Sequence, residues 1–416
     1  MSRVYMTLRS ALTLGAAVSI AACTSDEASR QVLGPRLNGD RAIFQNYVAL
    51  GNSITAGYQS SGINDSTQKL SYAALLARQM GTRYSYPALA GRGCLPPVAN
   101  FQTQTGIAGL TAAQRTQTCD LRLAASVTDI LTNVAVPNAS SYDPTDADGT
   151  PFSNALTALF LGGKSQVQKA LMAQPTFASI WIGNNDVLGF AVQDGRTNAP
   201  TGLAGITPVA TFTANYDAMI SQLTAGAPGL KGVLIGVVQV SNAPIMFPAA
   251  ALQNPTFKGG FDAIAGTTTV LDPSCGPAGA GFGSLINTFL AFQIRTGAHP
   301  ALIACVPGGA SGAIPAPVGD ILVLDPTEQA TLTARINAYN AYIAQKATDI
   351  GFAYLDVNPL LVSLKAGNSV VRQAPNFAQT GTFGTGMSLD GVHPAAPVQR
   401  EIANARIPVI NAKYGT

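Results

Sequence analysis

The stretch YVALGNSITAG, residues 47–57, begins as an apolar run and ends in small and polar residues. The apolar residues from 42 to 50 predict a strand that ends at Gly51, since a glycine interrupts an apolar run more readily than it continues one. Ser53 therefore directly follows the carboxyl end of a buried strand. In open parallel sheets, ligands bind outside these strand ends, so the position suits a reactive side chain.

The rest of the chain alternates short apolar runs with longer helical segments. The apolar runs predict three further strands, over 177–182, 232–240 and 352–356. Helical spacing, with starts and stops marked by serine, proline and glycine, predicts helices over 71–80, 165–174, 208–225, 326–350 and 394–414. Strands that alternate with helices are typical of an α/β fold whose parallel sheet is covered on both faces.

Two parts of the chain depart from this pattern. Residues 87–150 are rich in Gly, Pro, Asn and Thr, and we expect irregular structure there. Residues from about 241 to 323 are rich in Gly, Ala and Pro and separate two expected strands. We interpret them as an insertion over the strand-end edge and not as a separate domain, so that one domain covers 42–416.

The composition excludes some classes of function. The chain has 416 residues, of which 47% are hydrophobic, enough for a large buried core. Only 11% are charged, whereas about 25% is usual for soluble domains. The net charge of +3 is spread along the chain without a basic block, so we expect no nucleic-acid partner.

The N-terminus has the pattern of an export signal over residues 1–22. It carries Arg3 and Arg9, followed by an apolar run over 10–20 that is too short to span a bilayer. The string Ile-Ala-Ala before Cys23 resembles a bacterial lipobox, in which the cysteine becomes the lipidated N-terminus. The alternative is an ordinary signal peptide cut after an Ala-x-Ala-like site.

Lipidation at that cysteine predicts a chain anchored to the bacterial cell envelope. Residues 23–41 are mostly polar and lack apolar periodicity, so we interpret them as a tether between anchor and domain. Thr24, and not Asp, follows the cysteine. In Gram-negative lipoproteins this favours the outer membrane.

The four remaining cysteines predict two disulfides, because exported chains usually oxidise an even set. They are Cys94, Cys119, Cys275 and Cys305. Of three connectivities we prefer Cys94–Cys119 and Cys275–Cys305, since each closes a local loop. The alternative is buried free thiols. No pair has Cys-x-x-Cys spacing, and the histidines are too few to complete a zinc site.

The chain has only two histidines, and one of them lies beside an acid. His393 stands in the string SLDGVHP, three residues after Asp390, so that one turn can present both side chains to one site. A serine such as Ser53 becomes nucleophilic when an imidazole takes its proton and a carboxylate orients that imidazole. Asp356, at a strand end, is the alternative acid. His299 lies in the insertion and receives no role.

The string WIGNND, residues 181–186, follows a predicted strand and offers amide side chains. Preorganised N–H donors stabilise the oxyanion that forms during acyl transfer. The alternative is that Asn184 and Asn185 only hold a turn. Asp186 is expected to order the loop and not to touch substrate.

These blocks, in this order, resemble the SGNH (GDSL-type) hydrolase superfamily, and most closely its bacterial lipoprotein members. The resemblance runs from about residue 44 to the end. It implies a three-layer, doubly wound, flavodoxin-like parallel sheet, here with a large insertion. No Gly-x-Ser-x-Gly string occurs, which argues against the α/β-hydrolase fold.

The resemblance also implies roles for individual residues. Ser53 is the nucleophile, although Asn52 stands where the family usually has Asp. Asn185 donates its side-chain amide to the oxyanion, and the Ser53 N–H is a further donor. The family's remaining donor is a glycine N–H, for which Gly91 and Gly93 are candidates. We favour Gly93, because a disulfide at the next residue would pin its loop.

The implied function is that of an exported, lipid-anchored serine esterase. Ser53 attacks an ester carbonyl, an acyl-enzyme forms, and water activated by His393 releases the acid. No metal or organic cofactor is required, and we expect a lipid or small acyl ester as substrate. Apolar residues of the insertion either line an acyl pocket or pack on the sheet: Ile245, Met246, Phe247, Phe257, Phe261 and Phe289.

Two other classes of protein compete with this hypothesis. One is a non-catalytic surface lipoprotein that binds a ligand or an envelope component. The other is a structural envelope lipoprotein, which the low charge and the many small residues fit. Neither class requires serine, asparagine, aspartate and histidine at these positions.

Overall fold

The computed structural model describes residues 41–120, 122, 130–146, 156–192, 206–312, 322–367 and 370–416. The predicted signal peptide, the lipidation site Cys23 and all but the last residue of the tether lie outside the described residues. In the part of the chain that is described, no helix has both the length and the apolar character needed to cross a bilayer.

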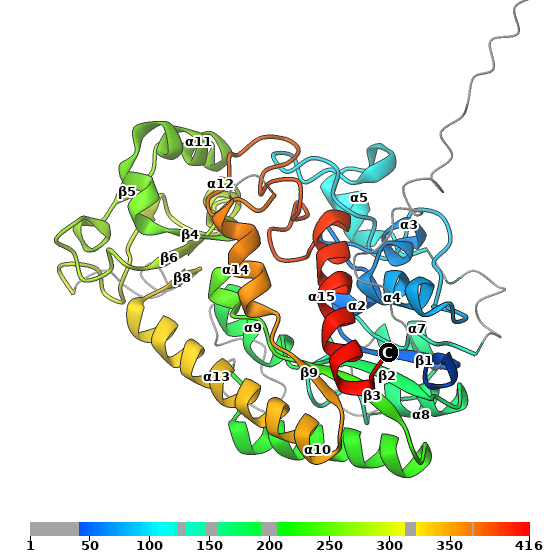
Figure 1. The fold of residues 1–416 in the computed structure, drawn as a ribbon. Helices are drawn as coiled ribbons and strands as arrows, with labels where there is room; N and C mark the ends of the chain where they lie inside the picture. The colour runs from blue at the N-terminus through cyan, green and yellow to red at the C-terminus, as the bar shows by residue number, and fades with distance from the viewer. Residues whose placement is uncertain are drawn as a thin grey trace, which may run out of the picture.

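Four parallel strands form the main sheet in the order β1-β2-β3-β9, with helices on both faces (Figure 1). The strands are β1 (Tyr47–Gly51), β2 (Phe177–Trp181), β3 (Lys231–Ile235) and β9 (Ala353–Leu355). The predicted α/β class is confirmed. The first strand begins five residues later than expected, because a 3-10 helix, η1 (Arg41–Phe44), comes before it.

A fifth segment, residues 131–136, runs along the other edge of β1. Asn133 forms a parallel bridge with Ala49. The N–H of Ala49 donates to Thr132 O at 2.7 Å, and the N–H of Val134 donates to Ala49 O at 2.9 Å. These residues form one isolated bridge and no strand, so they are irregular as expected, although they lie along the sheet. Because the chain passes from β1 to one side and then to the other, β1 lies at a switch point, where open sheets bind ligands.

The two faces of the sheet carry separate hydrophobic clusters, because side chains alternate along a strand. Tyr47 and Ala49 belong to one cluster, and Val48 and Leu50 to the other. The first face is covered by α4 (Tyr72–Met80) and α15 (Ala396–Tyr414). The second is covered by α8 (Gln166–Met172), α10 (Val209–Gly226) and α13 (Pro326–Asp349).

The ends of these helices follow from their capping residues. The Ser71 hydroxyl accepts a hydrogen bond from Ala74 N at the start of α4, and Gly81 ends this helix in the left-handed conformation. Asp325 and Glu328 form a capping box at the start of α13. All five helices predicted from the sequence are present, with ends within two residues of the expected ones.

The described residues of the insertion form short strands, two α-helices and 3-10 turns beyond the strand-end edge (Figure 1). Its elements are β4 (Met246–Pro248), α11 (Pro255–Ala265), β5 (Val270–Leu271), β6 (Leu285–Asn287), α12 (Leu290–Arg295), β7 (Leu302–Ile303) and β8 (Val323–Leu324). β4, β6 and β8 form an antiparallel sheet, and β5 pairs with β7. Cys275 and Cys305 form a disulfide here. Phe247 and Phe261 are fully buried in the cluster shared with α4 and α15, so these two pack and do not line a pocket.

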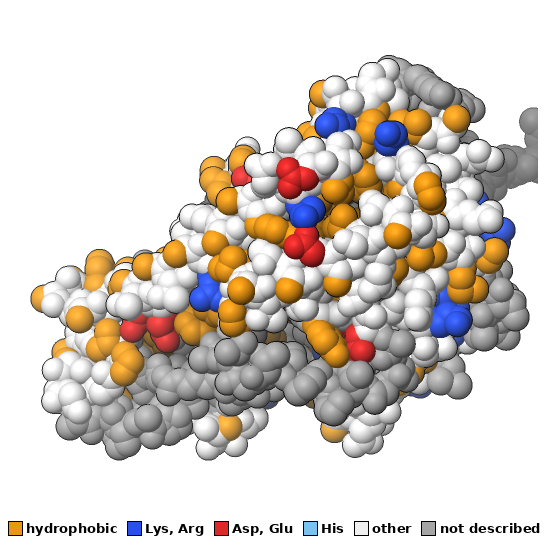
Figure 2. All heavy atoms as spheres, turned by 90° about the horizontal axis from the view of Figure 1, so that it is seen from below, with side chains coloured by type: hydrophobic (Ala, Val, Ile, Leu, Met, Phe, Trp, Pro, Cys, Tyr) orange, Lys and Arg blue, Asp and Glu red, His pale blue; other side chains and the backbone are white. Residues whose placement is uncertain are grey.

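The remaining α-helices of the described residues are short. They are α2 (Ser53–Ala56), α3 (Asp65–Lys69), α5 (Ala112–Gln117), α7 (Leu156–Leu161), α9 (Asn185–Val192) and α14 (Asn358–Ala366). The sequence analysis did not predict α14, which has no fully buried residue. On the face drawn in Figure 2, charged side chains are sparse and form no basic cluster.

Candidate active site

The end of β1 places Ser53 at the carboxyl edge of the sheet. The Gln166 side chain holds this end, because it accepts from Gly51 N at 2.9 Å and donates to Gly51 O at 3.1 Å. A side chain at Gly51 would meet Trp181 O at 2.8 Å, so only glycine fits there. Asn52 caps α2 by accepting from Ile54 N at 3.2 Å. Ser53 is therefore the first residue of α2, where a backbone N–H has no partner within the helix.

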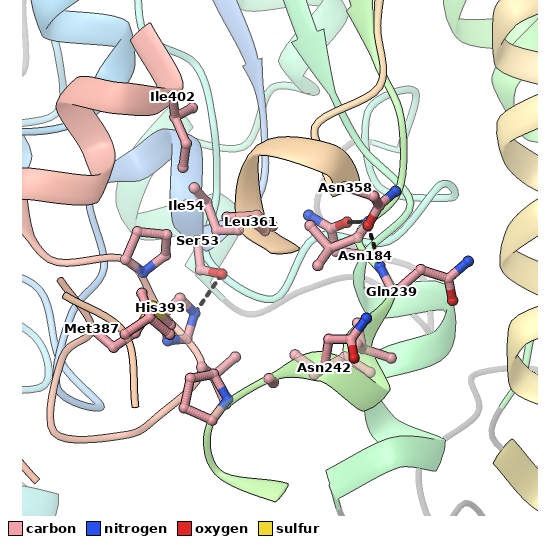
Figure 3. Close-up of a pocket in the computed structure, with 18 of the residues that line it drawn as sticks. Ser53, Ile54, Asn184, Gln239, Asn242, Asn358, Leu361, Met387, His393 and Ile402 are labelled. Carbon is pink, nitrogen blue, oxygen red and sulfur yellow. Dashed lines mark hydrogen bonds between the residues drawn. The ribbon is translucent and has the colours of Figure 1, made fainter. Parts of the chain in front are cut away.

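Ser53, His393 and Asp390 form one hydrogen-bonded line. His393 Nε2 lies 2.8 Å from Ser53 Oγ, and His393 Nδ1 lies 2.9 Å from Asp390 Oδ2. Figure 3 shows the serine hydroxyl pointing toward the imidazole. The three residues that the sequence analysis selected are thus brought together, in the arrangement that activates a serine hydroxyl.

The Asp390 carboxylate is buried and accepts several N–H and O–H donors. Oδ1 accepts from Ser388 Oγ at 2.8 Å, Val392 N at 2.9 Å and His393 N at 2.8 Å, and Oδ2 accepts from Ser61 N at 2.7 Å. Burial alone would raise the pKa of Asp390, but the imidazole and these donors hold that pKa well below its ordinary value. The group therefore stays ionised and can stabilise an imidazolium.

The support from Ser60, Ser61 and Ser388 was not predicted. Ser60 N donates to Ser388 Oγ at 2.8 Å, and Leu389 N donates to Ser60 Oγ at 3.1 Å. Ser60 and Ser61 both have positive φ, 54° and 52°, which L-residues adopt rarely. Ser60 lies 328 positions before Ser388 in the chain, so no spacing in the sequence could reveal the contact.

The Gly-Asn-Asn-Asp turn, residues 183–186, follows β2. It forms hydrogen bonds to the loop beyond β3 and to the loop beyond residues 131–136. Gly183 has a φ of 117°, which lets the chain leave the strand sharply. Asn184 Oδ1 accepts from Val238 N at 3.0 Å, beyond the end of β3. Asn185 Nδ2 donates to Ala139 O at 2.8 Å, beyond the segment 131–136. Asn185 therefore lies next to the turn that follows this segment.

Asp186 orders the same turn, as expected from the sequence. It is 3% exposed and accepts from Ser141 N at 2.8 Å and from Ser141 Oγ at 2.6 Å. Burial raises the pKa of Asp186 to about 6, although the Ser141 hydrogen bonds lower it.

The structure does not support Gly93 as an oxyanion donor. Its N–H donates to Asp120 Oδ2 at 3.1 Å, and its carbonyl accepts from Asp120 N at 2.9 Å. Neither Gly93 nor Gly91 borders the two cavities described next. The turn beside Asn185 instead contains Asn138, which is exposed and has a φ of 65°. Asparagine takes the left-handed conformation here, where a glycine would be the usual choice.

Two cavities border His393. One, which we call the narrow cavity, has a volume of about 850 Å³, part of it open to solvent, and reaches from Ser53 to α14 and α15. The other, which we call the wide groove, has a volume of about 1480 Å³ and reaches toward the insertion. Ile245 and Phe289 of the insertion line the wide groove.

The other sequence predictions have clear outcomes. Asp356 is exposed and accepts from Asn358 N, the first residue of α14, at 2.9 Å, so it is not the acid beside His393. His299 is buried in the insertion, with Nδ1 2.7 Å from Pro300 O. Cys94 is bonded to Cys119, so both preferred disulfide pairs are present. Among the described residues, no group of three or more His, Cys, Asp or Glu could hold a metal ion.

Comparisons with known proteins place this geometry in context. Residues 47–405 match the family model described as GDSL-like lipase/acylhydrolase. A search of curated proteins finds no match.

Three solved structures are among those similar to this chain. An extracellular lipase from Streptomyces rimosus is 17% identical, with 89% of this chain and 99% of that chain covered and a TM-score of 0.34. A phospholipase A1 from Streptomyces albidoflavus is 18% identical, with 88% and 98% covered and a TM-score of 0.34. A mutant acetyl-xylooligosaccharide esterase from Geobacillus is 10% identical, with 88% and 94% covered and a TM-score of 0.35. These values carry no inference about substrate.

Proposed function

Because this chain belongs to the GDSL-like lipase/acylhydrolase family, we propose that it is a serine esterase that uses Ser53, His393 and Asp390 to hydrolyse carboxylic esters. The observation that carries the proposal is the hydrogen-bonded line from Ser53 Oγ through His393 to Asp390, at 2.8 Å and 2.9 Å. A serine that only capped a helix would not need an imidazole and a buried carboxylate aligned behind it.

The first half of the reaction forms an acyl-enzyme. Ser53 Oγ bonds to the ester carbonyl carbon while its proton moves to His393 Nε2. Asp390 stabilises the resulting imidazolium through the hydrogen bond to Nδ1. The tetrahedral intermediate then collapses, the bond to the alcohol oxygen breaks, and His393 returns the proton to the leaving alcohol.

The second half releases the acid. A water molecule gives a proton to His393 and its oxygen bonds to the acyl carbon. The bond to Ser53 Oγ then breaks, and the serine recovers a proton from His393. The balance is one ester and one water converted to one acid and one alcohol. Every step uses residues of this chain and water.

The oxyanion is held by donors from three strand ends. We assign the N–H of Ser53, the N–H of Asn138 and the Nδ2 amide of Asn185. One N–H of that amide already donates to Ala139 O, which fixes the side chain and leaves the second N–H for the oxyanion. Such preorganised donors are worth about 3 kcal/mol each in the transition state.

We also propose that the chain is exported and anchored through lipid at Cys23, in the bacterial outer membrane. The N-terminal sequence carries this part of the proposal. The two disulfides, Cys94–Cys119 and Cys275–Cys305, support export, because structural disulfides persist in oxidising compartments. Radiolabelled palmitate should enter the wild-type chain and not its Cys23→Ala variant.

Hydrolysis of p-nitrophenyl esters by the full chain in detergent tests the esterase. We expect activity in the wild type, its loss in Ser53→Ala, and labelling of Ser53 by a fluorophosphonate. Absence of both hydrolysis and labelling in a folded protein would instead favour the non-catalytic surface lipoprotein.

A further inference from the structure

We propose that Arg115 is a positioning residue of the proposed catalytic triad, because it holds the turn at Ser60 and Ser61 against Asp390 and places a buried positive charge near that carboxylate. The inference rests on the proposed function for its kinetic part. Arg115 borders neither the narrow cavity nor the wide groove, so it acts through other residues and not on substrate. The sequence analysis gave this arginine no role.

The turn at Ser60 and Ser61 lies between two distant parts of the chain. Its two N–H groups donate to side chains of residues 388–390. Its two carbonyl groups accept from the other part, Ser60 O from Val98 N at 2.8 Å and Ser61 O from Arg115 Nη2 at 3.0 Å. Arg115 therefore holds the carbonyl of the same residue whose N–H donates to the triad carboxylate.

The conformation of this turn explains why these contacts matter. Ser60 and Ser61 both take the left-handed conformation, with φ of 54° and 52°. Two consecutive L-residues keep this conformation only where the surrounding structure holds them in it. Without the hydrogen bond from Arg115 the turn can relax, and the Ser61 N–H then moves relative to Asp390. The geometry of Asp390, and through it that of His393, therefore depends on Arg115.

The surroundings of α5 position the Arg115 side chain. Arg115 is 7% exposed and is the buried residue of this helix. A Cβ at Gly106 would lie 3.1 Å from Arg115 Cδ, so the glycine leaves room for the aliphatic stem. The disulfide partner Cys119 follows α5 by two residues, and Cys94 N donates to Ile63 O at 3.0 Å. The guanidinium thus reaches the turn from a segment that is bound to the same loop at a second point.

The charge of Arg115 has no ion-pair partner among the carboxylates that the structure describes. Its Nε likewise has no hydrogen-bond partner within the described ranges. Burial lowers the pKa of Arg115, whereas attraction to Tyr58 and to Asp390 raises it. A buried cation without an adjacent carboxylate is costly, so the interaction with Asp390 is the one that favours its presence here.

The same charge affects the imidazole of His393. This ring bonds to the Asp390 carboxylate through Nδ1, and the Tyr58 ring centre lies 4.9 Å from its own. Burial and the Asp390 charge raise the pKa of Tyr58, so its phenol is neutral and adds no charge. Lys365 lines the narrow cavity together with His393. A further positive charge, on Arg115, disfavours the imidazolium, so it helps His393 to remain ready to accept a proton.

Three substitutions of Arg115 in the full chain separate its charge from its hydrogen bond. Arg115→Met removes both. Arg115→Gln removes the charge but keeps an N–H donor that can bond to Ser61 O. Arg115→Lys keeps the charge and a donor, so it should resemble the wild type in both measurements below.

The first measurement is the titration of His393 by NMR, which does not depend on any ester. The chain has only two histidines, so labelling with isotope-enriched histidine gives two imidazole signals, and His393→Gln identifies the relevant one. We expect the midpoint of the His393 titration to rise by about half a pH unit in Arg115→Met and in Arg115→Gln, because a nearby positive charge is removed.

The second measurement is the pH dependence of ester hydrolysis. The acid limb of kcat/KM reports the free base, so it should move to higher pH by the same amount in the two uncharged variants. At the optimum, kcat should fall about tenfold in Arg115→Met with KM retained, and less in Arg115→Gln, whose amide still supports the turn.

Arg78→Met is the matched control. Arg78 is an exposed residue of α4, and its Nη2 also donates to a backbone carbonyl, Lys69 O, at 3.1 Å. This substitution removes the same unit charge and the same kind of hydrogen bond away from the site. It should change neither the His393 titration nor kcat.

The outcomes separate this inference from the proposed function. A wild-type His393 titration in folded Arg115→Met and Arg115→Gln overturns the inference even if kcat falls, because a merely structural arginine would give that result. An equal shift in Arg115→Lys or in Arg78→Met overturns it too. If Arg115→Met does not fold, Arg115→Gln decides alone. If no ester is hydrolysed but the titration shifts as expected, the esterase fails and the coupling of Arg115 to the triad stands.

Discussion

Asp186 accepts two hydrogen bonds from Ser141, one from the N–H at 2.8 Å and one from the hydroxyl at 2.6 Å, in a site where Asp186 is only 3% exposed. This contact joins the turn after β2 to the loop that follows residues 131–136. The same two loops carry Asn185 and Asn138, the donors that we assign to the oxyanion. The geometry of the proposed oxyanion site therefore depends on a buried carboxylate that borders neither cavity.

The first prediction concerns stability and pH. The pKa of Asp186 is about 6 in the fold, above the ordinary value of 3.8, so the folded chain binds this proton more tightly than the unfolded chain. The free energy of unfolding should then fall by about 3 kcal/mol as pH rises from about 4 to about 6, and stay level above that. Asp186→Asn should remove this slope in urea unfolding measured at each pH.

Asp349→Asn, at an exposed position of α13, is the control and should keep the wild-type slope. The pKa shift of Asp390 affects the free energy of unfolding at lower pH and with the opposite sign. Its pKa is depressed in the fold, so the stability it contributes is present above about pH 4 and is lost as pH falls below that value. An identical slope in Asp186→Asn and wild type would contradict the assignment to Asp186.

The second prediction distinguishes the two adjacent asparagines. Asn185→Ala should lower kcat about 100-fold with little change in KM, because a donor to the oxyanion acts mainly in the transition state. Asn184→Ala should lower kcat far less, because its Oδ1 only accepts from Val238 N. Steady-state kinetics on one ester decides between them, and the reverse order of effects would transfer the donor role to Asn184.

The third prediction concerns Ser388 as a positioning residue. Its hydroxyl donates to Asp390 Oδ1 at 2.8 Å and accepts from Ser60 N at 2.8 Å. Ser388→Ala leaves the Ser60 N–H without this partner and loosens Asp390, so kcat should fall about tenfold with KM retained.

Ser388→Thr keeps the hydroxyl and should recover most of that activity. A purely structural role would predict something different. In that case Ser388→Ala would lower the melting temperature while leaving kcat intact at a temperature where the variant is folded.

The sequence predicted the residues of the site better than their surroundings. Ser53 and Asn185 each follow a predicted strand, and His393 stands three residues after Asp390. The local sequence therefore places the first two at strand ends and the third beside an acid. Ser61 N donates to Asp390 and Ser60 N donates to Ser388, in each case from more than 320 residues away, and only the folded chain creates these contacts.

The proposed donor Asn138 differs from the glycine that the sequence analysis favoured. Gly93 was favoured because the family's donor is a glycine N–H and a disulfide at Cys94 would pin its loop. That disulfide is present, but the Gly93 N–H donates to Asp120 Oδ2 at 3.1 Å. Asn138 takes a positive φ of 65° without a glycine to signal it. The segment before it pairs with β1 through the single bridge between Ala49 and Asn133, which no sequence pattern indicated.

The fourth prediction concerns Arg406, which is fully buried in α15 although no described carboxylate pairs with it. Its guanidinium carbon lies 3.7 Å from the centre of the Tyr72 ring and 5.0 Å from that of Trp181, while Nε and Nη2 have no partner among the described residues. Burial lowers the pKa of Arg406, since the charge costs solvation there.

Arg406→Met keeps the packing and removes this cost, so it should raise the free energy of unfolding by about 1 kcal/mol. Arg406→Ala should lower it by about 3 kcal/mol because a cavity forms. If the methionine variant loses as much stability in urea as the alanine variant, the stacked cation is itself stabilising.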